Sequence, residues 1–180
     1  MPIGTHLMHS HDLAPYRWMI VSLPPFQSLV DAHWRDVARL AHALAGPTHG
    51  DDVAQTAWTK ALAAYPSVRS ATNLRGWLLT ITRNCAMDAH RSARQTVAVE
   101  DPATLLAAPV AAPRIDPRPE LWSAVAGLPE RQRAAVALKY VSDLDHREIA
   151  RVLDTTPAMS RRLVSDALAT LRLTLPEESR

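Results

Sequence analysis

The sequence predicts an all-α protein built from two small helical domains, which a proline- and alanine-rich linker joins. Apolar residues recur at intervals of three and four over most of the chain, as they do along one face of a helix, and no alternating strand pattern is found. Five prolines between residues 96 and 119 interrupt this pattern, which is typical of a linker. Because 47% of the 180 residues are apolar, the chain can build packed cores.

The apolar pattern divides the chain into five segments. We expect a variable N-terminal lead at 1–25, a first helical domain at 26–95, the linker at 96–119, a second helical domain at 120–175 and a tail at 176–180. No apolar run approaches the roughly 20 residues that cross a bilayer. The N-terminus lacks the basic segment and small-residue cleavage site of a secretory signal. We therefore expect a cytoplasmic protein with no membrane insertion.

Two helices are predicted at the start of the first domain. Apolar residues repeat at helical spacing over 26–44, and Gly46-Pro47 closes this helix. Asp51 and Asp52 mark the start of the second helix, because carboxylates there satisfy free backbone N–H groups and oppose the helix dipole. The apolar stripe of the second helix includes Leu62.

A third helix, from about Asn73 to Arg94, lies in the most basic part of the chain. Residues 66–95 contain five arginines and one aspartate, although the formal net charge of the whole chain is only +2. The polar side of this helix carries Arg83, Asn84, Asp88, Arg91 and Arg94. A local basic surface suggests contact with a polyanion, although a solvated helix face would have a similar composition.

Four helices are predicted in the second domain. The first two cover about 121–127 and 129–141, with Pro129 at the favoured first-turn position of the second. Asp145 and Glu148 have the spacing of a capping box, which opens a short third helix over 147–153.

The last two predicted helices form a helix-turn-helix. Thr156 can cap a longer final helix that has Pro157 at its first position and runs to about Leu173. A short helix, a tight turn and a longer helix are the parts of this motif.

Several residue types have a structural explanation that competes with a functional one. Cys85 lies in a helical pattern, where a free cysteine is expected to be buried. The tryptophans on apolar faces are expected in the cores: Trp34, Trp58, Trp77 and Trp122. Three N-terminal histidines have ligand-like spacing but no fourth ligand in reach: His6, His9 and His11. No paired carboxylates, glycine-rich phosphate loop or catalytic triad occurs, so we expect no enzyme, no catalytic residue, no metal and no cofactor.

Three segments and the C-terminal helix-turn-helix carry a family resemblance. The segments are Asp51-Asp-Val-Ala-Gln55, Asn73-Leu-Arg-Gly-Trp-Leu-Leu-Thr-Ile-Thr-Arg-Asn-Cys-Ala-Met-Asp88 and Gly127-Leu-Pro-Glu-Arg-Gln-Arg133. In their order and separations they resemble the extracytoplasmic-function sigma factors of the sigma-70 family. The resemblance runs from about Phe26 to Leu175, without the linker. It implies a region 2 helical bundle in the first domain, a region 4 helix-turn-helix in the second, and a sigma factor that directs promoter-specific initiation by RNA polymerase.

The resemblance also implies three sets of binding residues and their partners. The clamp helices of core RNA polymerase would be bound by Asp51, Asp52, Gln55 and Trp58. A second set would read the minus-10 promoter element and aid strand opening: Arg69, Asn73, Arg83, Asn84, Asp88, Arg91 and Arg94. The loop at 67–72 would take a base flipped out of the duplex. The minus-35 element would be read by Thr156, Ala158, Arg161, Arg162 and Ser165, with region 4 on the polymerase flap. An anti-sigma factor is a further implied partner.

The chain departs from the family pattern at a few positions. Thr56 stands where an acidic residue is usual, and Asp154 replaces a turn glycine, although aspartate tolerates the left-handed conformation. Leu163 and Asp166 occupy positions that are usually basic along the recognition helix. Because an acidic side chain that faces DNA weakens phosphate binding, we expect either an unusual or weak minus-35 preference or a domain that depends more on the polymerase.

Two other functions remain open from the sequence. A stand-alone helix-turn-helix regulator would bind DNA without polymerase, but it would have no need of the segment at 51–55. A degenerate sigma-like interaction protein would titrate a partner without opening promoters, and the absence of basic residues at 163 and 166 favours this alternative.

Overall fold

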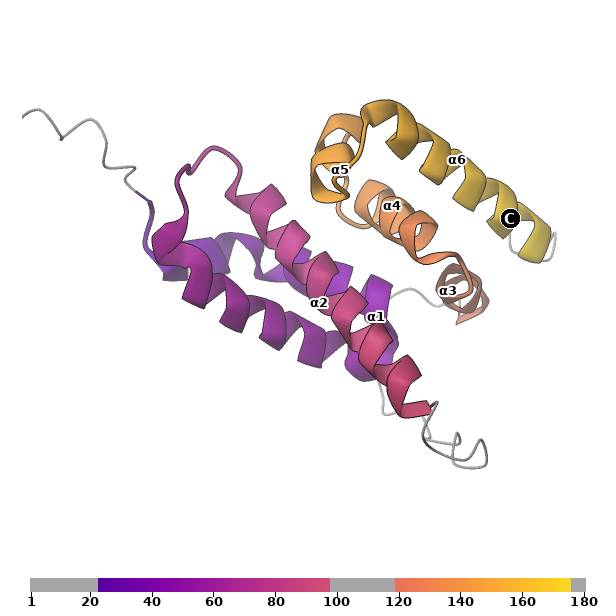
Figure 1. Cartoon of the computed structure of the whole chain (residues 1–180), viewed down its shortest axis with the longest axis horizontal. Coiled ribbons are helices and arrows are strands. Elements are labelled where there is room, and N and C mark those ends of the chain that lie inside the picture. The colour runs from indigo at the N-terminus through magenta and orange to yellow at the C-terminus, as the bar shows by residue number, and fades with distance from the viewer. Residues whose placement is uncertain (1–22, 98–118, 176–180) are drawn as a thin grey trace, which may run out of the picture.

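Helices make up all the regular structure in the described part of the chain (Figure 1). The computed structural model describes residues 23–97 and 119–175, and the side chains of 23–93 and 119–175. The helices are α1 (Phe26–Ala64), the 3-10 helix η2 (Tyr65–Ser67), α2 (Leu74–Val97), α3 (Pro119–Ala126), α4 (Glu130–Tyr140), α5 (His146–Val152) and α6 (Pro157–Thr174). This arrangement confirms the all-α class. The N-terminal lead with its three histidines, most of the linker and the tail lie outside the described residues.

α1 consists of two helical halves that meet at a kink. Gly46 has φ 75° and ψ 178°, a conformation essentially restricted to glycine, and Pro47 follows at once as the first residue of the second half. The predicted helix start at Asp51 and Asp52 is therefore about one turn too late. Pro47, which has no backbone N–H to satisfy, begins the second half of α1 instead. The two aspartates lie within the first turns of this half.

α1 and α2 pack along each other and enclose the core of the first domain. Leu40, Leu44, Leu78 and Leu79 are almost completely buried in it. Cys85 is buried as well, as predicted, and this burial raises the pKa of its thiol.

An aromatic group closes the end of the first domain where α1 begins. The ring of Phe26 meets those of Trp58 and Tyr65 edge-on, at centroid separations of 6.0 and 5.2 Å. The Tyr65 hydroxyl donates a hydrogen bond of 2.6 Å to the carbonyl of Pro24. Edge-on contacts of this kind add to the stability that burial alone provides.

Two predicted core positions are wrong. Trp34 is 51% exposed, and the Arg35 guanidinium lies 5.3 Å from the centre of its ring. Leu62 is 57% exposed. Both continue an apolar repeat, but the described helices cover only part of the face that the repeat defines. Trp58, Trp77 and Trp122 are half-buried against the cores.

The second domain contains the predicted helix-turn-helix. Asp145 accepts hydrogen bonds from the backbone of Arg147 and Glu148, and Glu148 accepts one from the Asp145 backbone, so the capping box is formed. Asp154 in the turn has φ 48°, the left-handed conformation expected there. Thr156 caps α6 by accepting a hydrogen bond from Met159.

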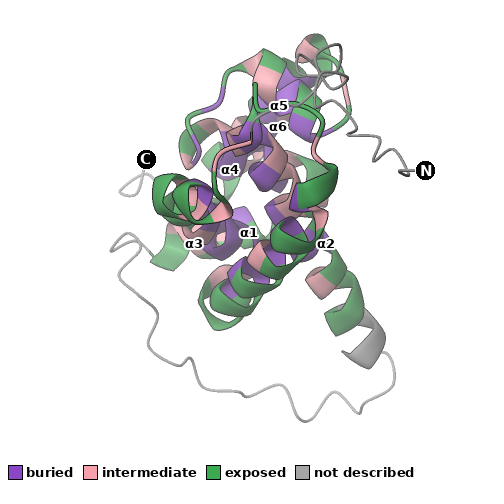
Figure 2. Ribbon diagram, turned by 90° about the vertical axis from the view of Figure 1, so that its left-hand side faces the viewer, coloured by how far each residue is buried: buried purple, intermediate pink, exposed green. Residues whose placement is uncertain are grey.

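The buried side chains of both domains meet in the interior. α4 contacts α1, and α5 contacts α2, so that one cluster of buried residues includes members of both domains. Figure 2 shows the buried positions on the inner sides of the helices and the exposed positions outside.

Candidate nucleic-acid interface

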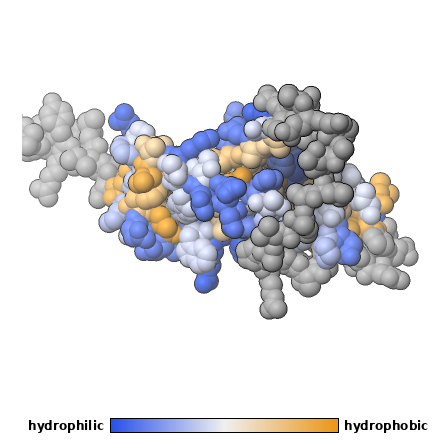
Figure 3. Space-filling model, turned by 90° about the horizontal axis from the view of Figure 1, so that it is seen from below, coloured by the Kyte–Doolittle hydropathy of each residue, from blue (hydrophilic) through white to orange (hydrophobic). Residues whose placement is uncertain are grey.

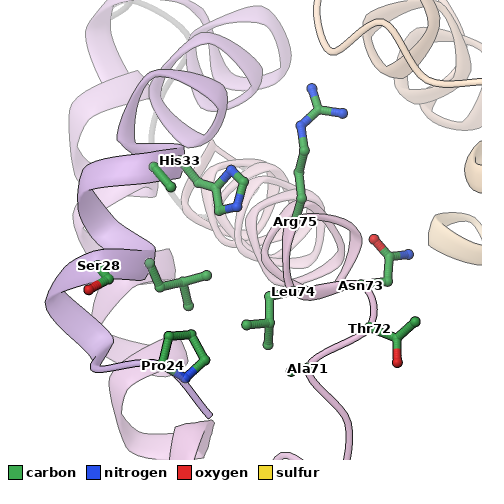
Figure 4. A pocket seen from close by; sticks show the side chains of 10 residues that line it. Pro24, Ser28, His33, Ala71, Thr72, Asn73, Leu74 and Arg75 are labelled. Atoms are coloured by element: carbon green, nitrogen blue, oxygen red, sulfur yellow. The ribbon is translucent and has the colours of Figure 1, made fainter.

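A pocket of about 350 Å³ lies between the start of α1 and the loop that leads into α2 (Figure 4). We call it the loop pocket; it is lined by Pro24, Ser28, Leu29, Ala32, His33, Ala71, Thr72, Asn73, Leu74 and Arg75. Half of these residues are apolar and half are polar or charged, so the pocket offers both kinds of contact to a small ligand. Figure 3 shows apolar surface at the same end of the molecule, where α1 begins.

The loop before α2 is held by short-range hydrogen bonds. The hydroxyls of Ser70 and Thr72 lie 2.7 Å apart, and the backbone N–H of Thr72 donates to Ser70 Oγ at 3.2 Å. Asn73 Oδ1 accepts a hydrogen bond from the backbone of Gly76 at 3.0 Å. A side chain at Gly76 would collide with this asparagine, so the cap and the glycine depend on each other. Asn73 thus caps α2 and is one of the residues that line the pocket.

Two titratable residues of the pocket lining, His33 and Arg75, contact the carboxylate of Asp36. Arg75 Nε and Nη2 donate to the two carboxylate oxygens of Asp36 at 2.9 and 3.2 Å. His33 Nδ1 lies 3.4 Å from Asp36 Oδ2. The hydrogen bond from Arg75 lowers the pKa of the Asp36 carboxyl below its ordinary value, against the opposing effect of burial.

The polar side of α2 forms a second hollow, of about 430 Å³, with the end of α1. Arg83 Nη1 donates to Asn84 Oδ1 at 3.0 Å, while Asp88 lies 3.3 Å from Lys60 Nζ and 3.6 Å from Arg91 Nη1. We call these residues the α2 basic face: Lys60, Arg83, Asn84, Asp88 and Arg91. Asn84, Asp88 and Arg91 are exposed and Arg83 is partly exposed.

Lys60 belongs to this face, although no local sequence pattern indicates it. It comes from the second half of α1, and only the packing of α1 on α2 brings it to Asp88. Arg69 is exposed in the loop, apart from this group. Arg94 lies beyond the residues whose side chains are described.

The residues predicted to bind polymerase differ in exposure. Asp51, Asp52 and Gln55 are exposed on the second half of α1, whereas Trp58 is half-buried against Phe26. Asp51 Oδ1 lies 2.9 Å from Nε2 of the buried His42, so this carboxylate is already oriented.

The predicted minus-35 residues share one outward face of α6. Thr156, Ala158, Arg161, Arg162 and Ser165 are all exposed there, while Val164, Ala167 and Leu171 are buried on the opposite side. Asp166 is exposed on the same outward face, with its Oδ2 3.7 Å from Arg162 Nε. Met159, which is not among the predicted minus-35 residues, is 41% exposed at the start of the same helix.

Two further properties concern the described residues alone. Within 23–97 and 119–175, no helix is both long and apolar enough to span a bilayer. In the same ranges, no three His, Cys, Asp or Glu side chains gather closely enough to hold a metal ion.

Comparisons with known proteins match both domains. The family model "Sigma-70 region 2" matches residues 29–96, and "Sigma-70, region 4" matches residues 118–171. The "ECF RNA polymerase sigma factor RpoE" of Cereibacter sphaeroides is 35% identical over 106 residues, which cover 55% of this chain and 55% of that protein. The match thus spans about half the length of that curated relative.

Two solved structures share the fold. The sigma factor RpoE from Bartonella quintana, in complex with the anti-sigma factor NepR, has a TM-score of 0.71 at 21% identity, and the match covers 83% of this chain and 95% of that one. CnrH in complex with the cytosolic domain of CnrY has a TM-score of 0.61 at 22% identity, covering 82% of this chain and 85% of that one. The two matched regions and the curated relative show that the chain belongs to the sigma-70 family, in its extracytoplasmic-function group.

Proposed function

We propose that this chain is a sigma factor that binds core RNA polymerase and directs promoter-specific transcription initiation. The observation that carries the proposal is the loop pocket, which opens beside the basic helix α2 within the segment matched to region 2. Flipping a base costs a few kcal/mol of stacking, which a pocket and nearby cationic groups offset. The arrangement suits recognition of an opened strand and requires no covalent chemistry.

Each domain has its own part in this function. Region 2, at 26–95, binds the clamp helices of polymerase through Asp51, Asp52 and Gln55, while Trp58 supports their helix from the core side. Its loop pocket receives the flipped minus-10 base. The strand contacts come from Arg69, Asn73, Arg83, Asn84, Asp88, Arg91 and Arg94.

Region 4, at 120–175, binds the flap and reads minus-35 DNA with the outward face of α6. The first backbone N–H groups of that helix, together with Arg161 and Arg162, supply phosphate contacts. Since each domain is small, specificity arises from both domains held on one polymerase.

The proposal extends to the location of the protein and to a further partner. A sigma factor works where polymerase and the chromosome are, so we place the protein in the cytoplasm. Both structural neighbours were solved with a partner, in one case a named anti-sigma factor, and we include an anti-sigma factor among the partners of this chain. The comparisons favour neither a stand-alone regulator nor a degenerate interaction protein.

Binding to core polymerase tests the proposal at its first step. A fluorescently labelled chain is titrated with bacterial core RNA polymerase, and anisotropy is measured. Asp52→Arg should weaken binding by about tenfold or more, because it reverses the charge on an exposed contact residue. The matched control is Asp31→Arg, an equally exposed acid on the first half of α1, which should bind as the unaltered chain does. Equal affinities for both variants, or no binding at all, would contradict the proposal.

A further inference from the structure

His42 is a buried histidine that contacts an acid proposed to bind polymerase. It lies in the first half of α1, and only 5% of its side chain is exposed. Its Nε2 lies 2.9 Å from Oδ1 of Asp51, which belongs to the second half of the same helix. Because an ionised carboxylate only accepts hydrogen bonds, the ring donates from Nε2. This bond joins the two halves of α1 across the kink at Gly46.

Gly50 provides the space that the ring of His42 occupies. A Cβ added at Gly50 would overlap the imidazole on its Nδ1 side, so the backbone of the second half packs directly against the ring. Nδ1 is buried, and it has no hydrogen-bond partner among the residues that the structure describes. The ring is therefore held by packing against Gly50 and by its single bond to Asp51.

The stability of the fold does not explain a histidine at this position. An apolar side chain of similar size would fill the same space without a buried, unpartnered nitrogen. The bond to Asp51 also contributes little stability, since 70% of the aspartate side chain is exposed. The bond does restrict the rotation of an exposed carboxylate, and this restriction points to a role at the surface.

The restricted carboxylate remains accessible to a partner. The bond from His42 uses Oδ1 of Asp51, so Oδ2 and most of the side chain are left for other contacts. Asp52 and Gln55 are exposed on the same half of α1. An oriented carboxylate binds a cationic group more tightly than a freely rotating one, because less conformational entropy is lost on binding.

We propose that His42 is a positioning residue for polymerase binding and that Gly50 is required to seat it. His42 holds Asp51 through Oδ1, so that Oδ2 binds a basic side chain of polymerase. This role rests on the proposed function, in which Asp51 contacts the clamp helices. It adds a buried residue that touches no polymerase atom and sets the affinity through Asp51.

Titration of the labelled full chain with core RNA polymerase tests this role. His42→Leu removes the donor but keeps the space filled, and it should weaken binding by about three- to fivefold, because one more side chain must be ordered on binding. His42→Gln should restore most of the affinity, since glutamine offers an N–H donor at about the place of Nε2. The matched control His49→Leu removes an exposed histidine of α1 and should bind as the unaltered chain does.

Gly50→Ala tests the same role without changing His42. Its added methyl group displaces the ring and should cause a loss of affinity similar to that of His42→Leu. Thermal unfolding followed by circular dichroism checks that each variant is folded at the temperature of the titration.

A double-mutant cycle separates positioning from a general structural role. In a chain that carries Asp51→Ala, the further change His42→Leu should cause no additional loss, because the histidine acts through that carboxylate. The same loss in both backgrounds, or an unchanged affinity of His42→Leu, would overturn the proposal. An unchanged affinity of Asp51→Ala would overturn it as well. Asp52→Arg tests polymerase binding independently of His42, so failure of this role is distinguishable from failure of the sigma function.

Discussion

At the scale of single residues, ion pairs on the described surface orient several charged side chains. Asp36 binds Arg75 beside the loop pocket, Asp88 lies between Lys60 and Arg91, and Asp166 lies beside Arg162 on α6. Partly exposed pairs contribute little stability each. Their main effect here is on which cations are available to a polyanion and which are already bound.

The Asp36–Arg75 pair should give the protein a measurable acid dependence. In the folded protein the pKa of the Asp36 carboxyl is lowered. The pair therefore stabilises the fold fully at pH values above the pKa of the same carboxyl in the unfolded chain, about 3.9. This contribution is lost as pH falls through the folded-state pKa. Because both side chains are partly exposed, we expect about 0.2–1 kcal/mol. Denaturant unfolding between about pH 3 and about pH 6 should show a weaker pH dependence in Asp36→Asn. An unchanged pH dependence would exclude this role.

Asp166 should limit binding of the α6 face to DNA. Asp166→Arg removes an acid from that face, frees Arg162 and adds a cation, so binding to minus-35 duplex DNA should strengthen and the salt slope should rise by about one. The control Asp31→Arg adds the same charge on α1, far along the chain from α6. The measurement is duplex binding at several salt concentrations. No gain over the control would show that α6 does not meet DNA through this face.

At the scale of elements, most helix starts follow from local sequence. Asp145 with Glu148, Thr156 with Pro157, and Asn73 all satisfy free backbone N–H groups, and each was recognisable from residue type and spacing or from its place at a helix start. Such signals act within a few residues, so the sequence alone is enough to find them.

Other features depend on partners that are distant in sequence. Periodicity placed Trp34 and Leu62 on apolar faces but does not tell how far the neighbouring helices cover those faces, and both are exposed. Lys60 reaches the α2 basic face only through packing of α1 on α2. The bond from Arg75 to Ser142 joins residues of different domains, and no local pattern predicts it.

The kink in α1 should be the least tolerant backbone position of the first domain. Gly46→Ala forces a side chain into a conformation that L-residues rarely adopt and should destabilise the fold by about 1–3 kcal/mol. Gly127→Ala is the matched control, because a Cβ there meets no atom closer than 3.4 Å and φ is not positive. Thermal unfolding followed by circular dichroism measures both. Equal melting temperatures would show that the chain relaxes at Gly46.

At the scale of the whole molecule, the proposed function requires two domains that bind different parts of one transcription complex. Region 2 contributes the loop pocket and the α2 basic face, and region 4 contributes the α6 face. Above all, the proposed function requires that the chain starts transcription.

Run-off transcription tests whether the chain starts transcription at promoters. Bacterial core RNA polymerase is incubated with a pool of genomic promoter fragments, with and without this protein, and the transcripts are sequenced. We predict discrete new transcripts that depend on the protein and disappear with the double substitution Asp51→Arg and Asp52→Arg, while Asp31→Arg leaves them in place. The proposed sigma function would be contradicted if the protein bound core polymerase but started no transcript, or if transcripts persisted unchanged with the double variant.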